Sequence, residues 1–286
     1  WKGACDMHLG TMTKTYERPT LEAVFQAMTN DGLYAAQLNL LSHGMETMPA
    51  HADGARIEEI RLLATRYGID LCGLSGTFNM IDPDVEARTE SCRRFDTLCG
   101  IAASLRVPMV ALCTGSKNPK SKWEWHDDND TPEAWADLLR TTETILKCAD
   151  KHHVYLGVEI EASNIINSPL RARRYLDTFG GSRLKILMDG ANLFTPARIG
   201  RMRETLDEAF ALIGGDIVLA HAKDLGRSAA LSFVAAGEGV LDFEHYIELL
   251  RRYRYDGALI MHGRSEAQVP HSTRFLQRQL QGANEV

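Results

Sequence analysis

Eight short apolar runs alternate along the chain with longer amphipathic segments, and this alternation restricts the possible folds more than any other feature of the sequence. The spacing predicts strands at 7–13, 35–41, 69–76, 108–115, 154–161, 184–189, 217–224 and 257–263. It predicts helices at 21–28, 52–67, 85–105, 132–151, 169–179, 200–212, 243–253 and 266–280. Because strands that alternate with helices form parallel sheets with right-handed crossovers, we expect a series of βα units.

The number of units and the length of the chain together favour one architecture. Eight βα units in 286 residues are typical of a closed (β/α)8 barrel, or TIM barrel, rather than of a doubly wound sheet. No linker-like stretch or change of composition interrupts the pattern, so residues 1–286 are predicted to form a single domain. In such barrels the active site lies at the C-terminal ends of the strands.

The composition excludes several classes of protein. Hydrophobic residues make up 44% of the chain, and its net charge of −6 is not that of a protein that binds nucleic acid. No apolar run approaches the roughly 18 residues of a membrane span, and the N-terminal segment lacks the apolar core of a signal peptide. The six cysteines form no CxxC pair. We therefore expect free thiols in a cytoplasmic protein, with neither nucleic acid nor a membrane as its partner.

Polar side chains occur at the C-terminal ends of four consecutive predicted strands, from the fifth to the eighth. They are Glu159 and Glu161, then Asp189 and Asn192, then His221 and Lys223, and finally His262, Arg264 and Glu266. A carboxylate at the end of an apolar strand costs several kcal/mol unless something pairs with it. We therefore predict one divalent metal ion held by Glu159, Asp189, His221 and a fourth group. His262 is the first candidate for this fourth ligand, and Glu161 or water is the alternative. Manganese, magnesium, cobalt and zinc all suit a mixture of carboxylates and imidazoles.

Each predicted ligand also has a purely structural interpretation. Asp189 could cap a turn, and His221 could be a hydrogen-bonded core histidine. Glu159 could pair with Lys185 or Lys223. Four such residues on adjacent strand ends favour the metal site over these separate explanations.

Two predicted connections are unusually long, at 115–130 and 225–242, and long loops in compact domains are usually functional or disordered. The first contains Trp123, Trp125 and His126, so we predict a lid whose tryptophans either stack on substrate or pack the loop. Lys223 either binds substrate or forms a salt bridge, and the same alternatives hold for Arg264. Further candidates for substrate binding are Glu161, Asn192, His8, His43 and Asn79.

Several segments resemble the sugar phosphate isomerase/epimerase family, the xylose-isomerase-like barrels related to AP endonuclease family 2. The segments are GVEIEASN, LKILMDGANLF, LAHAKD with AAGEGVLDF downstream, GALIMHGRSE, GTFNMIDPD, and the stretch from CTGSKNPK to DTPEAW. In the ketose 3-epimerases of this family, strands five to eight supply Glu, Asp, His and Glu as metal ligands. The first three match Glu159, Asp189 and His221, whereas His262 occupies the position of the second Glu.

This difference at His262 affects the expected mechanism. In the epimerases that the chain resembles, the two glutamates flank the substrate carbon; one removes a proton and the other returns it. Here the second base could be His262, Glu266 or Glu161, or a single base could act. The related endonucleases hold three zinc ions. Where they have a histidine, three residues after the aspartate, this chain has Asn192. We therefore expect one metal ion and no DNA cleavage.

The resemblance implies a metal-dependent isomerase or epimerase that acts on a keto sugar or related polyol through an enediolate. Glu159 or a neighbouring carboxylate would remove the proton, Lys223 would stabilise the oxyanion, and His262 would be a second acid or base. The alternatives are a lyase, either a dehydratase or an enzyme that cleaves 3-keto glycosides, and a non-catalytic sugar-binding subunit. The same resemblance allows a homo-oligomer.

Overall fold

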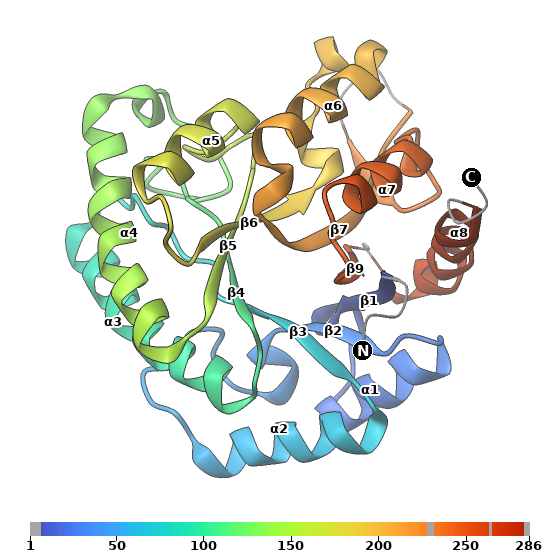
Figure 1. The fold of residues 1–286 in the computed structure, drawn as a ribbon. Coiled ribbons are helices and arrows are strands. Elements are labelled where there is room, and N and C mark those ends of the chain that lie inside the picture. The colour runs from blue at the N-terminus through green and yellow to red at the C-terminus, as the bar shows by residue number, and fades with distance from the viewer. Residues whose placement is uncertain (1–6, 228–231, 263–264, 283–286) are drawn as a thin grey trace.

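The fold is described by a computed structural model that places residues 7–227, 232–262 and 265–282. Eight parallel strands close into a barrel (Figure 1). They are β1 (His8–Met12), β2 (Ala35–Leu38), β3 (Asp70–Ser75), β4 (Met109–Leu112), β5 (Tyr155–Glu159), β6 (Leu184–Asp189), β7 (Ile217–Leu225) and β9 (Ala258–Met261). Strands β1 to β7 each pair with the next barrel strand along the chain, and β9 pairs with both β7 and β1. This closed parallel barrel confirms the predicted TIM barrel.

Helices alternate with the strands and surround the barrel (Figure 1). In the described part of the chain they are α1 (Leu21–Asn30), α2 (Gly54–Tyr67), α3 (Val85–Ser104), α4 (Pro132–His152), α5 (Pro169–Thr178), α6 (Met202–Ile213), α7 (Phe243–Arg252) and α8 (Val269–Gly282). Helix α4 begins as the sequence predicts. The side chain of Thr131, the N-cap residue, accepts a hydrogen bond from the Ala134 N–H, and Pro132 follows the cap. Ser168 caps α5 in the same way.

The structure differs from the predicted elements near the C-terminus. The helix expected at 266–280 opens with a 3-10 turn, Glu266–Gln268, and α8 starts only at Val269. In the connection expected at 225–242, a short strand, β8 (Phe233–Ala235), pairs antiparallel with β7. The carboxylate of Asp224 holds this hairpin, because it accepts hydrogen bonds of 2.7 to 3.0 Å from four backbone N–H groups: those of Leu225, Gly237, Gly239 and Leu241.

The interior of the barrel is filled by Met109, which requires glycine on the neighbouring strands. A Cβ atom at Gly157 would lie 2.1 Å from Met109 Cε, and one at Gly73 would lie 2.9 Å from Met109 Sδ. Leu187 and Leu219 belong to the same buried cluster. Side chains two residues apart share a face of a strand. The residues two positions after Gly157, Leu187 and Leu219 therefore also point into the barrel, closer to the C-terminal ends of the strands. They are Glu159, Asp189 and His221.

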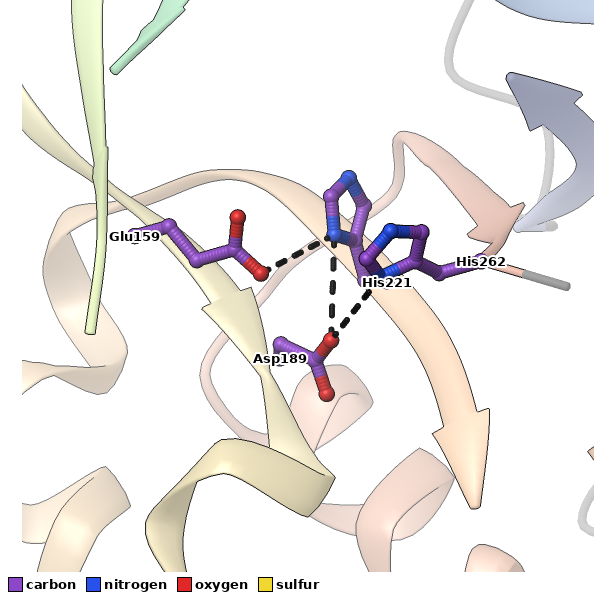
Figure 2. A group of neighbouring side chains, drawn as sticks. All are labelled: Glu159, Asp189, His221 and His262. Carbon is purple, nitrogen blue, oxygen red and sulfur yellow. Dashed lines mark ion pairs between the residues drawn. The ribbon is translucent and has the colours of Figure 1, made fainter. Parts of the chain in front are cut away.

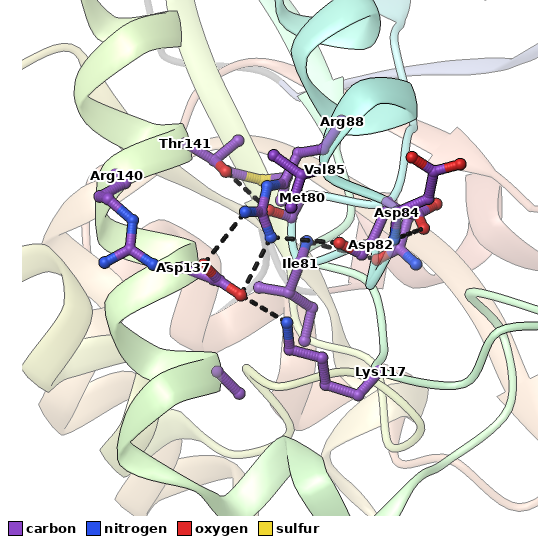
Figure 3. A network of polar contacts seen from close by, with 12 residues as sticks. Met80, Ile81, Asp82, Asp84, Val85, Arg88, Lys117, Asp137, Arg140 and Thr141 are labelled. Carbon is purple, nitrogen blue, oxygen red and sulfur yellow. Dashed lines mark hydrogen bonds and ion pairs between the residues drawn. The ribbon is translucent and has the colours of Figure 1, made fainter.

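The long connection 115–130 after β4 is anchored to its neighbours. Asn164, which follows β5, accepts a hydrogen bond from the Gly115 N–H at 2.7 Å and donates one to the Lys122 carbonyl at 2.9 Å. On α4, Asp137 contacts three cations (Figure 3), namely Arg88, Lys117 and Arg140. The connection is therefore held at its start and in its middle.

Two further expectations concern the environment of the chain. Within the described ranges, no helix combines the length and the hydropathy of a transmembrane segment. The described cysteines are free thiols, at Cys72, Cys92, Cys99, Cys113 and Cys148. Cys5 lies outside the described residues.

Candidate metal centre

Three adjacent strands and the segment after β9 each bring one ligand-type side chain to the same point. Glu159 and Asp189 are the last residues of β5 and β6, and His221 on β7 is the register partner of Asp189. His262 directly follows β9. Figure 2 shows that the four side chains point toward one another. The structure thus brings together the four residues that the sequence offers as ligands.

The distances between the potential ligand atoms match those expected around one ion. His221 Nδ1 lies 3.4 Å from Glu159 Oε1 and 3.8 Å from Asp189 Oδ2. His262 Nδ1 lies 3.7 Å from the same Asp189 oxygen. Two ligands of a tetrahedral ion, each about 2.1 Å from it, stand about 3.4 Å apart. The spacing therefore suits a shared cation.

Unsatisfied polar atoms provide an independent test of this fit. Asp189 Oδ2, His221 Nδ1 and His262 Nδ1 are buried and make no hydrogen bond within the described part of the chain. A buried polar atom without a partner costs about 1–3 kcal/mol. The ligand atoms of the cluster all lie within 4.8 Å of one another. With the proton of each imidazole on Nε2, all three atoms present lone pairs, and one divalent cation would satisfy them together. The residues present therefore fit the predicted metal.

Asp189 combines two of the roles that the sequence left open. Its Oδ1 accepts a hydrogen bond from the Ala191 N–H at 3.0 Å, as a turn-capping acid does. Its Oδ2 faces the two histidines. Beyond this turn, Asn192 Nδ2 donates to Glu159 Oε1 at 3.1 Å. The turn after β6 thus fixes the orientation of both carboxylates.

Lys223 is buried beside the ligands. Its Nζ lies 3.1 Å from Asp189 Oδ2, which is an ion-pair contact, and donates to Asn192 Oδ1 at 2.5 Å. The ammonium also lies 4.2 Å from the ring centroid of Phe233 on β8. Lys185, the other partner considered for Glu159, pairs with Asp216 at 2.8 Å, so that interpretation was wrong.

Burial and the neighbouring charges shift the ionisation of the whole cluster. Burial raises the pKa of Glu159, and burial together with the Glu159 carboxylate raises the pKa of Glu161 to about 8. Burial lowers the pKa of His221 to about 4, so this imidazole is neutral at pH 7 and has a lone pair to offer. Burial opposes ionisation of Asp189, but the ammonium of Lys223 and the two imidazoles lower its pKa overall.

The candidate residues on the connection after β4 lie at its surface. Trp123 and Trp125 are 47% and 37% exposed. The Lys122 ammonium lies 5.3 Å from the Trp123 ring centroid, and Trp125 Nε1 donates to Asp127 Oδ1 at 3.2 Å. His126 caps the turn Asp127–Asp130 through Nδ1. These contacts orient the loop side chains, and a role in substrate binding stays a prediction.

Asn79 and His43 lie outside the four-residue cluster. Asn79 makes hydrogen bonds to both backbone groups of Ser116, at 2.8 and 3.0 Å, and so ties the β3 and β4 connections together. His43 Nε2 lies 3.3 Å from Glu59 Oε2 on α2. Neither position supports the substrate contact that the sequence suggested.

The remaining candidates are divided between the two ends of the barrel. His8 begins β1, at the end opposite the cluster, and lies 3.5 Å from Asp70; its expected place near the site was wrong. Glu266, considered as a second base, is held by Arg18. Arg264 lies outside the described residues.

Sequence reasoning missed residues that contact the centre from distant strands. Gln37 on β2 is 2% exposed, and its Oε1 lies 2.7 Å from His221 Nε2. A polar residue in the apolar run AAQLNLL was the available signal. Beside His262, a polar pocket of about 470 Å³ opens between the ends of β1 and β9, with Lys14 and Glu17 in its lining. This pocket borders the cluster at His262.

Comparisons with solved structures find the same fold in a sugar epimerase, in an epimerase-like protein and in a protein described with zinc. The E. coli 3-keto-D-glucoside 4-epimerase is similar at 16% identity, with a TM-score of 0.73 over 95% of this chain and 99% of the other. A D-tagatose 3-epimerase-like protein is similar at 16% identity, with a TM-score of 0.74 over 98% and 99%. The IOLI protein, described with a bound zinc atom, shares 14% identity and a TM-score of 0.71 over 96% and 98%.

Sequence comparisons identify the family directly. No curated protein sequence matches the chain. Residues 33–279, which include the four clustered side chains, match the sequence profile of the xylose isomerase-like TIM barrels. The chain belongs to the xylose isomerase-like TIM barrel family.

Proposed function

We propose that the protein is a divalent-metal-dependent isomerase or epimerase that acts on a keto sugar or a related polyol. The observation that carries this proposal is the group of three buried, unsatisfied ligand atoms on Asp189, His221 and His262 at the C-terminal face of the barrel. The adjacent polar pocket of about 470 Å³ is large enough for a monosaccharide. The epimerase and the epimerase-like protein with the same fold support this choice of substrate class.

The reaction begins with the proton on the carbon next to a substrate carbonyl. Glu159 takes this proton, and the electron pair of the broken C–H bond forms an enediolate whose negative charge resides on the former carbonyl oxygen. A divalent metal at the centre supplies positive charge next to that oxygen when it is bound. Lys223, whose ammonium lies 3.1 Å from Asp189 Oδ2, adds a second positive charge beside the cluster. If Glu159 returns the proton to the neighbouring carbon, the product is the isomer. If a second acid protonates the opposite face of the same carbon, the product is the epimer, and His262 is the candidate for this acid.

A lyase is the second candidate, and the residues on the β9 side favour it. His262 stands at the fourth ligand position, and Glu266 is paired with Arg18. Among the described residues that follow β9, neither His262 nor Glu266 offers an unpaired carboxylate as a second base. One base is enough to remove the proton while a β-hydroxyl or β-glycosyl group leaves with the electron pair.

Deuterium uptake tests the shared first step. The protein, loaded with Mn²⁺ or Zn²⁺, is incubated in D2O with ketoses, cyclic keto polyols and 3-keto glycosides, and the sugars are analysed by mass spectrometry and NMR. We expect deuterium on the carbon next to the carbonyl with at least one substrate. Glu159→Gln should abolish the uptake, whereas Glu133→Gln, a change on the exposed first turn of α4, should leave it intact.

The products separate the two candidates. A stereoisomer or positional isomer that carries deuterium supports the isomerase or epimerase, and an unsaturated ketone supports the lyase. If no substrate takes up deuterium with either metal, the enediolate mechanism is wrong for both.

A further inference from the structure

A chain of two hydrogen bonds reaches the candidate metal centre from the far side of the barrel. Gln37 Nε2 on β2 donates to Ser75 Oγ on β3 at 3.1 Å, and Gln37 Oε1 lies 2.7 Å from His221 Nε2. Gln37 and Ser75 are 2% and 4% exposed. Both side chains are thus shielded from water, which would otherwise offer competing hydrogen bonds.

The neighbours of His221 Nδ1 and the binding of a metal favour different tautomers of this histidine. Nδ1 points toward the carboxylates of Glu159 and Asp189, at 3.4 and 3.8 Å, and two acceptors there favour a proton on Nδ1. A metal ligand must instead present a lone pair at Nδ1, which places the proton of the neutral ring on Nε2. The tautomer that the carboxylates favour in the metal-free protein is therefore the one that cannot bind a metal.

Gln37 decides between these tautomers, because its carbonyl oxygen can only accept a hydrogen bond. An Nε2–H group can donate a hydrogen bond to Gln37 Oε1. An unprotonated Nε2 would instead place its lone pair next to a lone pair of the oxygen, and the two would repel each other. Ser75 Oγ accepts a hydrogen bond from the amide nitrogen of Gln37, and in this orientation the amide oxygen faces His221.

We propose that Gln37, held by Ser75, is a positioning residue that locks His221 in the Nε2–H tautomer, so that Nδ1 is ready to bind the metal before the metal arrives. The inference rests on the proposed metal centre. Outer partners of this kind orient metal-binding histidines, and their loss typically weakens metal binding 10- to 100-fold.

The test measures the tautomer and the metal affinity separately. Nitrogen-15 NMR of the histidine side chains in metal-free protein at pH 7.5 shows which nitrogen of His221 carries the proton, with His221→Asn used to assign the signal. We expect Nε2–H in the wild type. Gln37→Met keeps the length of the side chain but removes the acceptor, so the proton should move to Nδ1. Gln37→Glu keeps an acceptor oxygen and should retain Nε2–H.

Zn²⁺ affinity, measured by competition with a chelating dye, should follow the tautomer. We expect Gln37→Met to bind Zn²⁺ about 10- to 100-fold more weakly and Gln37→Glu to stay close to the wild type. Thr142→Val is the matched control: Thr142 is buried and contacts Tyr175, away from the centre. It should lower stability without changing Zn²⁺ affinity, so a general loss of stability can be recognised.

The outcomes distinguish this inference from the proposed function. Nδ1–H in the wild-type spectrum would overturn the role of Gln37 even if no variant folded, and so would an unchanged tautomer in Gln37→Met. Nε2–H in the wild type and Nδ1–H in Gln37→Met, in a protein that binds no metal, would support the lock and refute the proposed function. If the wild type has Nε2–H and Gln37→Met has Nδ1–H, but the two proteins bind Zn²⁺ equally well, the tautomer of His221 does not control metal binding and that part of the inference is refuted.

Discussion

Asp137 on α4 provides the sharpest test of the energetics, because its single carboxylate forms ion pairs with three cations (Figure 3). Its oxygens lie 3.0 Å from Arg88 Nη1 and 2.5 Å from Lys117 Nζ, and Arg140 contacts it as well. The side chains of Arg88, Lys117 and Asp137 are 12%, 13% and 14% exposed. The cluster is therefore screened by water much less than an ordinary surface ion pair.

The pKa of Asp137 gives the size of the effect. Burial opposes ionisation, but Lys117, Arg88 and Arg140 lower the pKa from 3.8 to about 2. Since one pKa unit corresponds to about 1.4 kcal/mol, the ionised carboxylate stabilises the folded protein by about 2 kcal/mol. Asp137→Asn also leaves two nearly buried cations without their partner, which adds to the loss. We expect Asp137→Asn to lower the free energy of unfolding by about 2–4 kcal/mol at pH 7.

The loss should depend on pH in a defined direction. The folded pKa lies below the unfolded value, so the stabilisation is present in full above about pH 5 and disappears as the pH falls from about 4 towards 2. Urea unfolding followed by circular dichroism at pH 7 and pH 3 measures this directly. The difference between the wild type and Asp137→Asn should shrink at pH 3.

Asp96→Asn is the matched control for Asp137→Asn. Asp96 joins the same two helices by contacts of 2.7 Å to Lys151 and 3.0 Å to His152, but it is 40% exposed. We expect a loss below about 1 kcal/mol. A loss below about 0.5 kcal/mol for Asp137→Asn at pH 7, or equal losses in the two variants, would refute the argument from burial.

Two further predictions concern the candidate metal centre. Purified wild-type protein should contain about one equivalent of a divalent metal by elemental analysis, and both Asp189→Ala and His262→Ala should lose it; retention in His262→Ala would remove His262 from the ligands. Lys223→Met should lower kcat by about 100- to 1,000-fold, as expected for loss of an oxyanion-stabilising group; kcat is measured at saturating metal ion, so that weaker metal binding by the less well supported carboxylates does not contribute. Unchanged kcat in Lys223→Met would assign Lys223 a structural role.

The alternation of strands and helices was sufficient to predict the barrel, because each βα unit is a local pattern that the sequence carries in full. The same argument located Glu159, Asp189 and His221, since residues at the ends of adjacent parallel strands meet at one face. Strand β8 was missed because it has only three residues and depends on the hairpin contacts of Asp224, which no local pattern records.

Contacts across the barrel could not be predicted in the same way. Gln37 and His221 are 184 residues apart and lie on β2 and β7, which do not pair with each other. Their contact depends on which inward side chains face one another across the barrel, and strand periodicity does not specify this. Asn79 and His43 follow strands in the sequence, but local turns direct them toward Ser116 and Glu59 instead of the centre.

The position of Lys223 explains how two carboxylates remain close together in a buried site. Its ammonium offsets the charge of Asp189 directly, at 3.1 Å. Its hydrogen bond to Asn192 Oδ1 orients the amide whose nitrogen donates to Glu159. One lysine therefore supports both carboxylates, by charge on one side and by hydrogen bonding on the other. The same Asp189 oxygen also lies 3.8 Å from His221 Nδ1 and 3.7 Å from His262 Nδ1, so it can serve a shared cation as well as the ammonium.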